Sequence, residues 1–199
     1  MYMIKKVDHR IHCMKDTAWE QANVADVTCI NWEEFSWCPK TQAKILYSDY
    51  GLHIQLQTDE KDLVATYRTQ NSAVCDDSCM EFFFRPNEND KRYFNFEFNP
   101  FGTMYFGFRY DRYDYVNPEE DKQFFEVKSY VDENLWTVQF TVPFAYIENM
   151  VGGYTKNMFG NIYKCASGTD HEHYATYYPV KTDHPDYHLP ETFGAFVLE

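Results

Sequence analysis

The 199-residue sequence has few basic side chains and no long apolar run. Lys and Arg number 18 against 31 Asp and Glu, for a formal net charge of −13. Nucleic-acid binding needs clustered Lys and Arg, and anionic membrane surfaces attract the same residues. Membrane spans need about 18 or more consecutive apolar residues. We therefore expect no nucleic acid, no membrane insertion, and a partner that is neutral or a cation.

The N-terminal segment lacks the apolar stretch of a signal peptide. Lys5 and Lys6 are followed by Asp8, His9 and Arg10, where that stretch would lie. The sequence as it stands therefore indicates a cytoplasmic protein, whereas removal of a leader would make it secreted or periplasmic. The length favours one domain, residues 1–199, and we expect a monomer.

The six cysteines do not form a disulfide framework or a zinc motif. No Cys-x-x-Cys occurs, and Cys75 and Cys79 are four residues apart. On a strand this spacing places two side chains too far apart for a bridge. We expect mainly buried free thiols and no bond between these two residues.

Aromatic residues fill the role that Leu and Ile have in other cores, with 17 Phe, 17 Tyr and 4 Trp. Hydrophobic and polar side chains alternate with a period of two along many segments, which is typical of half-buried strands. The expected strands are 43–47, 52–57, 63–69, 79–85, 93–99, 103–109, 124–131, 135–142, 161–166, 174–178 and 194–198. A short helix should follow Pro143 and end at Gly152. The fold class is therefore all-β, an antiparallel β-sandwich with one short helix.

The three strongest strands have one aromatic face. Alternation places Phe82, Phe84, Phe94, Phe96, Phe98, Phe106 and Phe108 on it, and we expect these rings between two sheets. Asn99 to Gly102 should form the hairpin turn between two of these strands.

The opposite face of the same strands is polar. It should carry Glu81, Asn95, Glu97, Asn99, Tyr105 and Arg109. Carboxylates, amides, a guanidinium and a phenol suit sugar hydroxyls and a stacked pyranose ring. A solvated outer face with weak ion pairs is the alternative that periodicity leaves open.

Several motifs occur together in a recognisable order. They are Asp76-Asp77-Ser78-Cys79-Met80-Glu81, Tyr93-Phe94-Asn95-Phe96-Glu97-Phe98-Asn99, Trp136-Thr137-Val138 with Pro143-Phe144, Tyr163-Lys164-Cys165, His173-Tyr174-Ala175 and His188-Leu189-Pro190-Glu191. As a set they resemble the carbohydrate-binding module family 9-like domain, over roughly residues 30–199.

This resemblance implies a β-sandwich related to DOMON domains that binds sugar-chain ends between two aromatic rings. It implies Glu81, Glu97 and Asn99 as polar contacts, Tyr177 as one wall, and Lys164 and His173 at or near the rim. Val74-Cys75 stand where sugar-binding relatives have a Trp, so the second wall is missing. The resemblance also implies a structural calcium, and we expect no other cofactor.

Three functions fit these observations. The first is a non-catalytic module that binds a carbohydrate, and the second is a glycan hydrolase that uses Glu81 and Glu97 as acid and base. The third is an interaction domain whose sugar site has decayed. A transition-metal site among His171, His173, His184 and His188 is a further hypothesis, against which loop histidines in solvent or hydrogen bonds are favoured.

Overall fold

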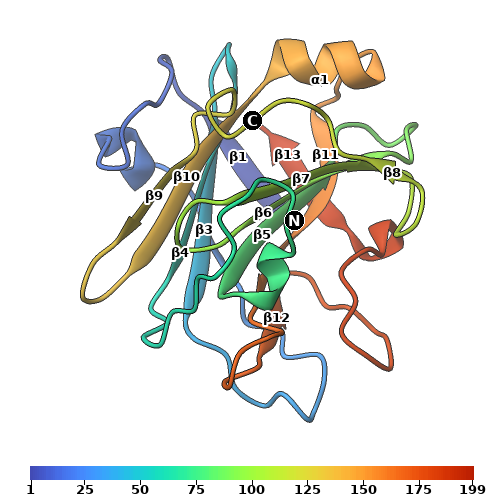
Figure 1. The fold of residues 1–199 in the computed structure, drawn as a ribbon. Helices are drawn as coiled ribbons and strands as arrows, with labels where there is room; N and C mark the ends of the chain where they lie inside the picture. Colours follow the sequence, from blue (N-terminus) through green and yellow to red (C-terminus); the bar gives the residue numbers. More distant parts are fainter.

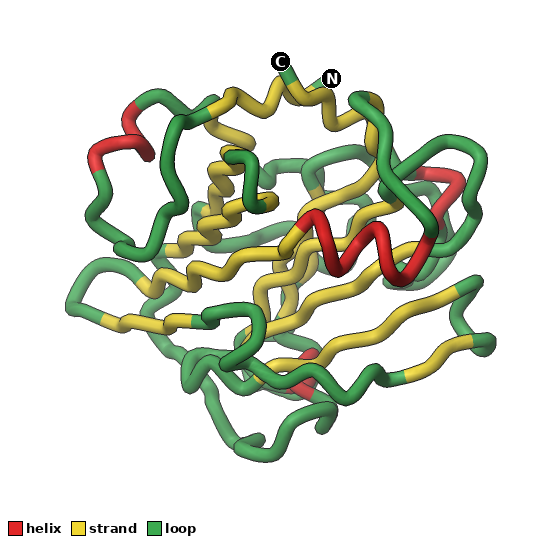
Figure 2. The backbone as a smooth tube through the Cα atoms, turned by 90° about the horizontal axis from the view of Figure 1, so that it is seen from above, coloured by secondary structure: helices red, strands yellow, loops and turns green.

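Two β-sheets lie face to face in the computed structural model, which describes residues 1–199 (Figures 1 and 2). The strands are β1 (Tyr2–Lys6), β2 (Val24–Asp26), β3 (Thr41–Tyr47), β4 (Gly51–Thr58), β5 (Cys79–Arg85), β6 (Tyr93–Phe98), β7 (Met104–Arg109), β8 (Tyr115–Val116), β9 (Lys128–Val131), β10 (Trp136–Pro143), β11 (Asn157–Cys165), β12 (Tyr174–Thr176) and β13 (Gly194–Leu198). The first sheet has the order β8-β7-β6-β5-β11-β13-β1, and the second has the order β1-β3-β4-β10-β9. The predicted β-sandwich is confirmed.

Strand β1 joins the two sheets. Its first residues pair with β13 and its last two pair with β3, and both pairings are parallel. All other strand pairs are antiparallel, with β12 added to β11 and β2 added to β3. The N- and C-terminal strands therefore lie side by side at the seam of the sandwich (Figure 2).

The predicted short helix is present as α1 (Phe144–Val151), directly after β10. Pro143 precedes its first turn, and Gly152 ends it at a φ of 79°, a left-handed conformation that favours glycine. Three single 3₁₀ turns complete the fold, η1 (Thr17–Glu20), η2 (Val74–Asp76) and η3 (Pro190–Thr192). The structure contains no helix with the length and hydrophobicity that a bilayer crossing requires.

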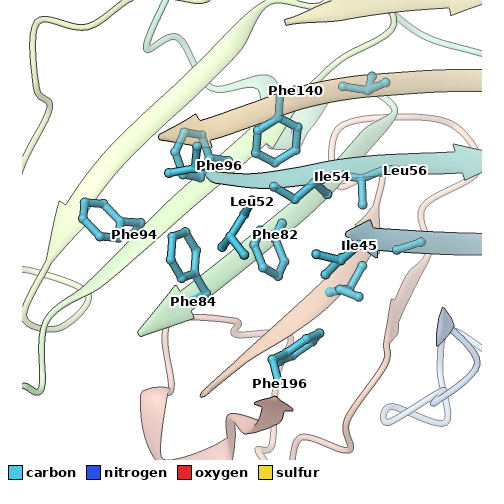
Figure 3. Packing of buried hydrophobic residues seen from close by; sticks show 14 of the residues in the cluster. Ile45, Leu52, Ile54, Leu56, Phe82, Phe84, Phe94, Phe96, Phe140 and Phe196 are labelled. Atoms are coloured by element: carbon cyan, nitrogen blue, oxygen red, sulfur yellow. The ribbon is translucent and has the colours of Figure 1, made fainter. Parts of the chain in front are cut away.

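Phenylalanine rings fill the space between the sheets (Figure 3). Six of the seven predicted rings are at most 1% exposed, and Phe108 is partly buried against the same cluster. The Phe96 ring packs on those of Phe106 and Phe140, with centroids 4.5 and 5.2 Å apart. The alternation therefore identified the inter-sheet face correctly.

One predicted strand is wrong and three short ones were missed. Residues 63–69 form a loop, because side chains of the next segment take its backbone hydrogen bonds. The Asp77 carboxylate accepts from the Thr66 and Tyr67 amides, and the Ser78 hydroxyl accepts from the Val64 amide. The missed strands are β1, β2 and β8, of which two have only two or three residues.

Candidate functional site

The outer face of the first sheet is covered by loops rather than open to solvent. Trp32, Val180 and Phe193 from three separate loops belong to a second buried cluster that includes Phe83 and Tyr163 of the sheet. Of the predicted surface, Glu81, Asn95, Glu97, Asn99 and Arg109 are all at most 6% exposed. Aromatic loop residues therefore bury most of the predicted polar face.

Five of the predicted residues do share this face. Glu81 of β5 lies directly opposite Glu97 of β6. Arg109 Nε donates to Asn95 Oδ1 at 2.5 Å, and Asn95 Nδ2 donates to Glu97 Oε1 at 2.8 Å. Arg109 also donates to the Tyr105 hydroxyl at 2.8 Å. Arg109 therefore orients Glu97 through the Asn95 amide rather than by a direct ion pair.

Asn99 has a structural role at the end of β6. Its Nδ2 donates to the Tyr67 carbonyl and to Asp77 Oδ2, at 2.7 and 2.9 Å. Its Oδ1 accepts from the Phe101 and Thr103 amides and so closes the predicted hairpin turn. All polar atoms of the side chain are used, so Asn99 has nothing left to offer a ligand.

A cavity of about 310 Å³ remains open above the two glutamates. Glu81 and Glu97 form part of its lining, with Tyr174, Tyr187 and His188 as its aromatic side chains. The Tyr187 ring is fixed by stacking on Tyr163, with centroids 4.1 Å apart and planes 12° apart. The cavity therefore combines paired carboxyl groups with rigid aromatic rings, as sugar recognition requires.

The remaining lining is polar and well anchored. Ser167 Oγ donates to the Cys75 carbonyl and to Asp76 Oδ1. Arg112 and Asp186 form an ion pair of 2.6 Å that also lines the cavity. Donors and acceptors are thus present beside the aromatic side chains.

Burial changes the protonation of the cavity groups. Desolvation raises the pKa of Glu81, and desolvation together with the Glu81 charge raises the pKa of Glu97 well above its usual range. Burial also lowers the pKa of His188 to about 3, and the charge of Arg109 adds to this effect. The imidazole is therefore neutral, and at least one carboxyl group can donate a hydrogen bond.

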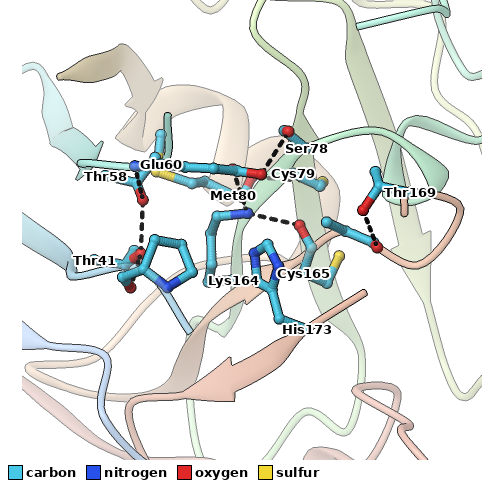
Figure 4. A network of polar contacts seen from close by, with 12 residues as sticks. Thr41, Thr58, Glu60, Ser78, Cys79, Met80, Lys164, Cys165, Thr169 and His173 are labelled. Carbon is cyan, nitrogen blue, oxygen red and sulfur yellow. Dashed lines mark hydrogen bonds and ion pairs between the residues drawn. The ribbon is translucent and has the colours of Figure 1, made fainter. Parts of the chain in front are cut away.

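Lys164 and His173 lie elsewhere. Lys164 alternates with Tyr163 and Cys165 on β11, so its side chain enters the inter-sheet side, where Nζ pairs with Glu60 Oε2 at 2.9 Å (Figure 4). His173 lies beside this pair and packs against the Trp37 ring, with centroids 5.3 Å apart. Glu60 and Trp37 line a different cavity, of about 520 Å³. The expected position of Lys164 and His173 at the rim does not match the structure.

Tyr177 is not a wall of the glutamate cavity. Its ring packs on Tyr2, Tyr178 and Phe196 at the inter-sheet core. Cys75 does line the cavity, at the place where the sequence lacks the expected Trp. The cavity's tyrosines, Tyr174 and Tyr187, were missed. Tyr174 belongs to the His173-Tyr174-Ala175 motif, but Tyr187 lies in a loop where no periodic pattern could identify it.

The proposed cluster of histidines does not form. His173 is buried, His171 is exposed beside the second cavity, and His188 lies in the first. The one close group of metal-ligating side chains is Cys79, Glu81 and Cys165. All six cysteines are free thiols, and Cys75 and Cys79 are not joined. Only Cys79 and Cys165 are buried, three others are partly buried and Cys13 is exposed, so the expectation of mainly buried thiols is met only in part.

Solved structures share this fold. A candidate carbohydrate-binding protein from Bacteroides uniformis aligns with a TM-score of 0.85 at 22% identity, over 99% of this chain and 98% of the other. A family 9 carbohydrate-binding module from Caldicellulosiruptor kristjanssonii in complex with glucose aligns with a TM-score of 0.67 at 12% identity, over 99% and 94%. The same module's cellotriose complex gives 0.68 at 11% identity, over 100% and 93%.

Sequence comparison gives the family. Among functionally curated proteins, no sequence matches this chain. The family model described as carbohydrate-binding family 9 matches residues 13–198, which is nearly the whole length. The resemblance found in the motifs and the structural alignments agree with this match. The chain therefore belongs to carbohydrate-binding family 9.

Proposed function

We propose that this non-catalytic carbohydrate-binding module binds a sugar in the cavity above Glu81 and Glu97. The observation that carries the proposal is the combination, in one cavity, of two cross-strand carboxyl groups and two tyrosines. Carboxyl groups form directional hydrogen bonds with hydroxyls, and aromatic rings pack on the apolar face of a pyranose. The family and the ligands named for its solved members, glucose and cellotriose, support a carbohydrate.

The size of the cavity favours a small ligand. Its volume of about 310 Å³ lies at the lower end of the range of about 300–1,000 Å³ for ligand pockets. A monosaccharide or the terminal unit of a chain fits this volume better than an extended segment. We therefore infer recognition of a sugar end. Independently of this cavity, we propose that the domain is a monomer.

The hydrolase alternative is disfavoured by the family rather than by the environment of the two glutamates. Glycosidases need one protonated and one ionised carboxyl group, in environments that separate their pKa values. Here burial raises the pKa of both Glu81 and Glu97, as it does for many buried carboxyl groups, so the shifts alone do not assign an acid and a nucleophile. The non-catalytic interpretation rests on the family, whose solved members are carbohydrate-binding modules.

A glycan array followed by calorimetry tests the proposal. Glu97→Ala removes a hydrogen-bonding group from the cavity and should weaken binding of any hit about tenfold, which is the effect of losing about 1.5 kcal/mol of hydrogen bonding. Glu133→Ala, in an exposed loop, is the matched control and should bind as the parent does. Equal affinity of both variants would place the site elsewhere. Release of reducing ends by the parent would favour the hydrolase.

A further inference from the structure

Three side chains that can bind a metal, those of Cys79, Glu81 and Cys165, lie close together beside the cavity, and none of them forms an ion pair. Cys79 and Glu81 are two residues apart on β5, so they share a face, and Cys165 of β11 lies directly opposite Cys79. Their ligand atoms all lie within 4.8 Å of one another, and Cys165 Sγ is 3.1 Å from Glu81 Oε1. Two neighbouring strands thus offer three donors on one face.

We propose that Cys79, Cys165 and Glu81 form a binding site for a thiophilic divalent transition metal, with zinc as the best fit. Tetrahedral zinc has Zn–S bonds of about 2.3 Å and Zn–O bonds of about 2.0 Å, so its donors lie roughly 3.5–3.8 Å apart. In this structure Cys165 Sγ and Glu81 Oε1 are 3.1 Å apart, and no two of the three donor atoms are more than 4.8 Å apart, so the separations lie on either side of this value. Small side-chain rotations would bring all three donors to zinc-binding distance.

The choice of metal follows from the donors. Thiolates select zinc and softer ions, whereas calcium and magnesium prefer sites made entirely of oxygen. Binding releases one proton from each thiol, and the resulting thiolates and the Glu81 carboxylate bring three negative charges to a divalent ion.

The cavity gives a metal ion access to the site and leaves one coordination position free. Glu81 and Cys165 line the 310 Å³ cavity, while Cys79 is fully buried behind them. A metal would enter through the cavity and keep its fourth ligand position toward it. Three protein ligands and one free position are the arrangement of zinc sites that bind a further ligand.

Cobalt(II) titration of the fully reduced protein tests the site. A tetrahedral cobalt–thiolate complex has intense charge-transfer and visible bands, which should appear at one equivalent and be displaced by zinc but not by calcium. Cys165→Ser should weaken cobalt binding roughly a hundredfold or more. Glu81→Gln should also weaken it, but by a smaller factor. Cys29→Ser removes a half-buried thiol elsewhere and should leave the titration unchanged.

A second measurement needs no variant. Cys165 is buried, so its alkylation depends on local opening of the fold; zinc should slow that alkylation relative to the metal-free protein, as mapped by mass spectrometry, while the exposed Cys13 stays equally reactive. Absence of the thiolate bands, bands that survive Cys165→Ser, or protection confined to other cysteines would overturn the proposal. Because metal ions alone are the probe, the result is independent of sugar binding.

Discussion

Single residues decide how the polar face is arranged. Asn95 is the link that transmits the position of Arg109 to Glu97, and it fits because its cross-strand neighbour is Gly107. A Cβ on Gly107 would lie well within the carbon–oxygen contact distance of Asn95 Oδ1 and 3.1 Å from Arg109 Nε. The glycine is therefore required by a close approach of side chains, and its backbone angles are ordinary.

Gly107→Ala should break this chain of hydrogen bonds. The added methyl group would displace the Asn95 amide, and such overpacking typically costs about 1–3 kcal/mol of folding free energy. Urea denaturation measures the effect. The cost should shrink in the background of Asn95→Ala, where the methyl group has room, so the two changes should be non-additive. If the losses of stability in Gly107→Ala and Asn95→Ala were additive in the double variant, the methyl group would not act through the Asn95 side chain.

Residue-level patterns predicted most of this face from the sequence. Strict alternation placed Glu81, Asn95, Glu97 and Arg109 together because a period of two is a local property of a strand. The same alternation within residues 161–166 places Lys164 and Tyr163 on opposite faces of their strand. It therefore argues against the position of Lys164 at the rim of the site, which the family resemblance implied. Tyr187 could not be predicted, because its place depends on where a long loop folds back.

At the scale of elements, β11 connects two different polar environments. Its outer face carries Tyr163 and Cys165 beside the glutamate cavity, and its inner face carries Lys164. The side chains of Lys164 and Glu60 are 0% and 6% exposed, and Ser78 Oγ donates to the other Glu60 oxygen at 2.7 Å. This buried pair is part of the sandwich rather than of the sugar cavity.

Lys164→Met should therefore lower stability strongly. Removing one partner leaves the other charge buried and unpaired, which typically costs about 3–5 kcal/mol. Adding Glu60→Gln removes that charge while keeping an acceptor for Ser78, so the double variant should regain much of the loss. Guanidinium denaturation of the three proteins measures this. Equal stability of the single and double variants would show that the pair is not electrostatically coupled.

Elements were predicted well where they were long and periodic. The strands that became β4, β5, β6, β7 and β10 were expected within one residue or so of their observed ends. Residues 63–69 have the composition of a strand, but Asp77 and Ser78 satisfy their backbone groups instead. Such side-chain competition depends on a neighbouring loop and leaves no mark in the periodicity.

At the scale of the whole molecule, burial keeps several histidines neutral. Burial lowers the pKa of His53 and of His173 to about 4 each, and that of His188 to about 3. All three lie below the ordinary value near 6.5, so the folded protein resists taking up protons that the unfolded chain accepts. The fold should therefore lose stability in mild acid through histidines in different parts of the sandwich.

His53 offers the clearest test of this acid sensitivity, because it lies in the second sheet, away from Glu81 and Glu97. Its ring nitrogens contact Ser48 Oγ and Thr141 Oγ1 at 2.9 and 3.1 Å. Burial lowers its pKa most, the Arg10 charge lowers it further, and Glu126 opposes them. The contribution of the neutral His53 side chain to the free energy of unfolding is complete above pH 6.5 and is lost as the pH falls toward 4.

Over that interval His53 should account for about 3 kcal/mol of lost stability, since one pKa unit corresponds to about 1.4 kcal/mol. The free energy of unfolding from urea titrations at pH 7, 6, 5 and 4 measures the slope. In His53→Gln the slope should be smaller, whatever the variant's stability at pH 7, because the unfolded chain no longer takes up that proton. His184→Gln, at an exposed loop position, should keep the parent's slope. A His53→Gln slope equal to that of the parent would mean that the buried imidazole is already protonated in the folded state.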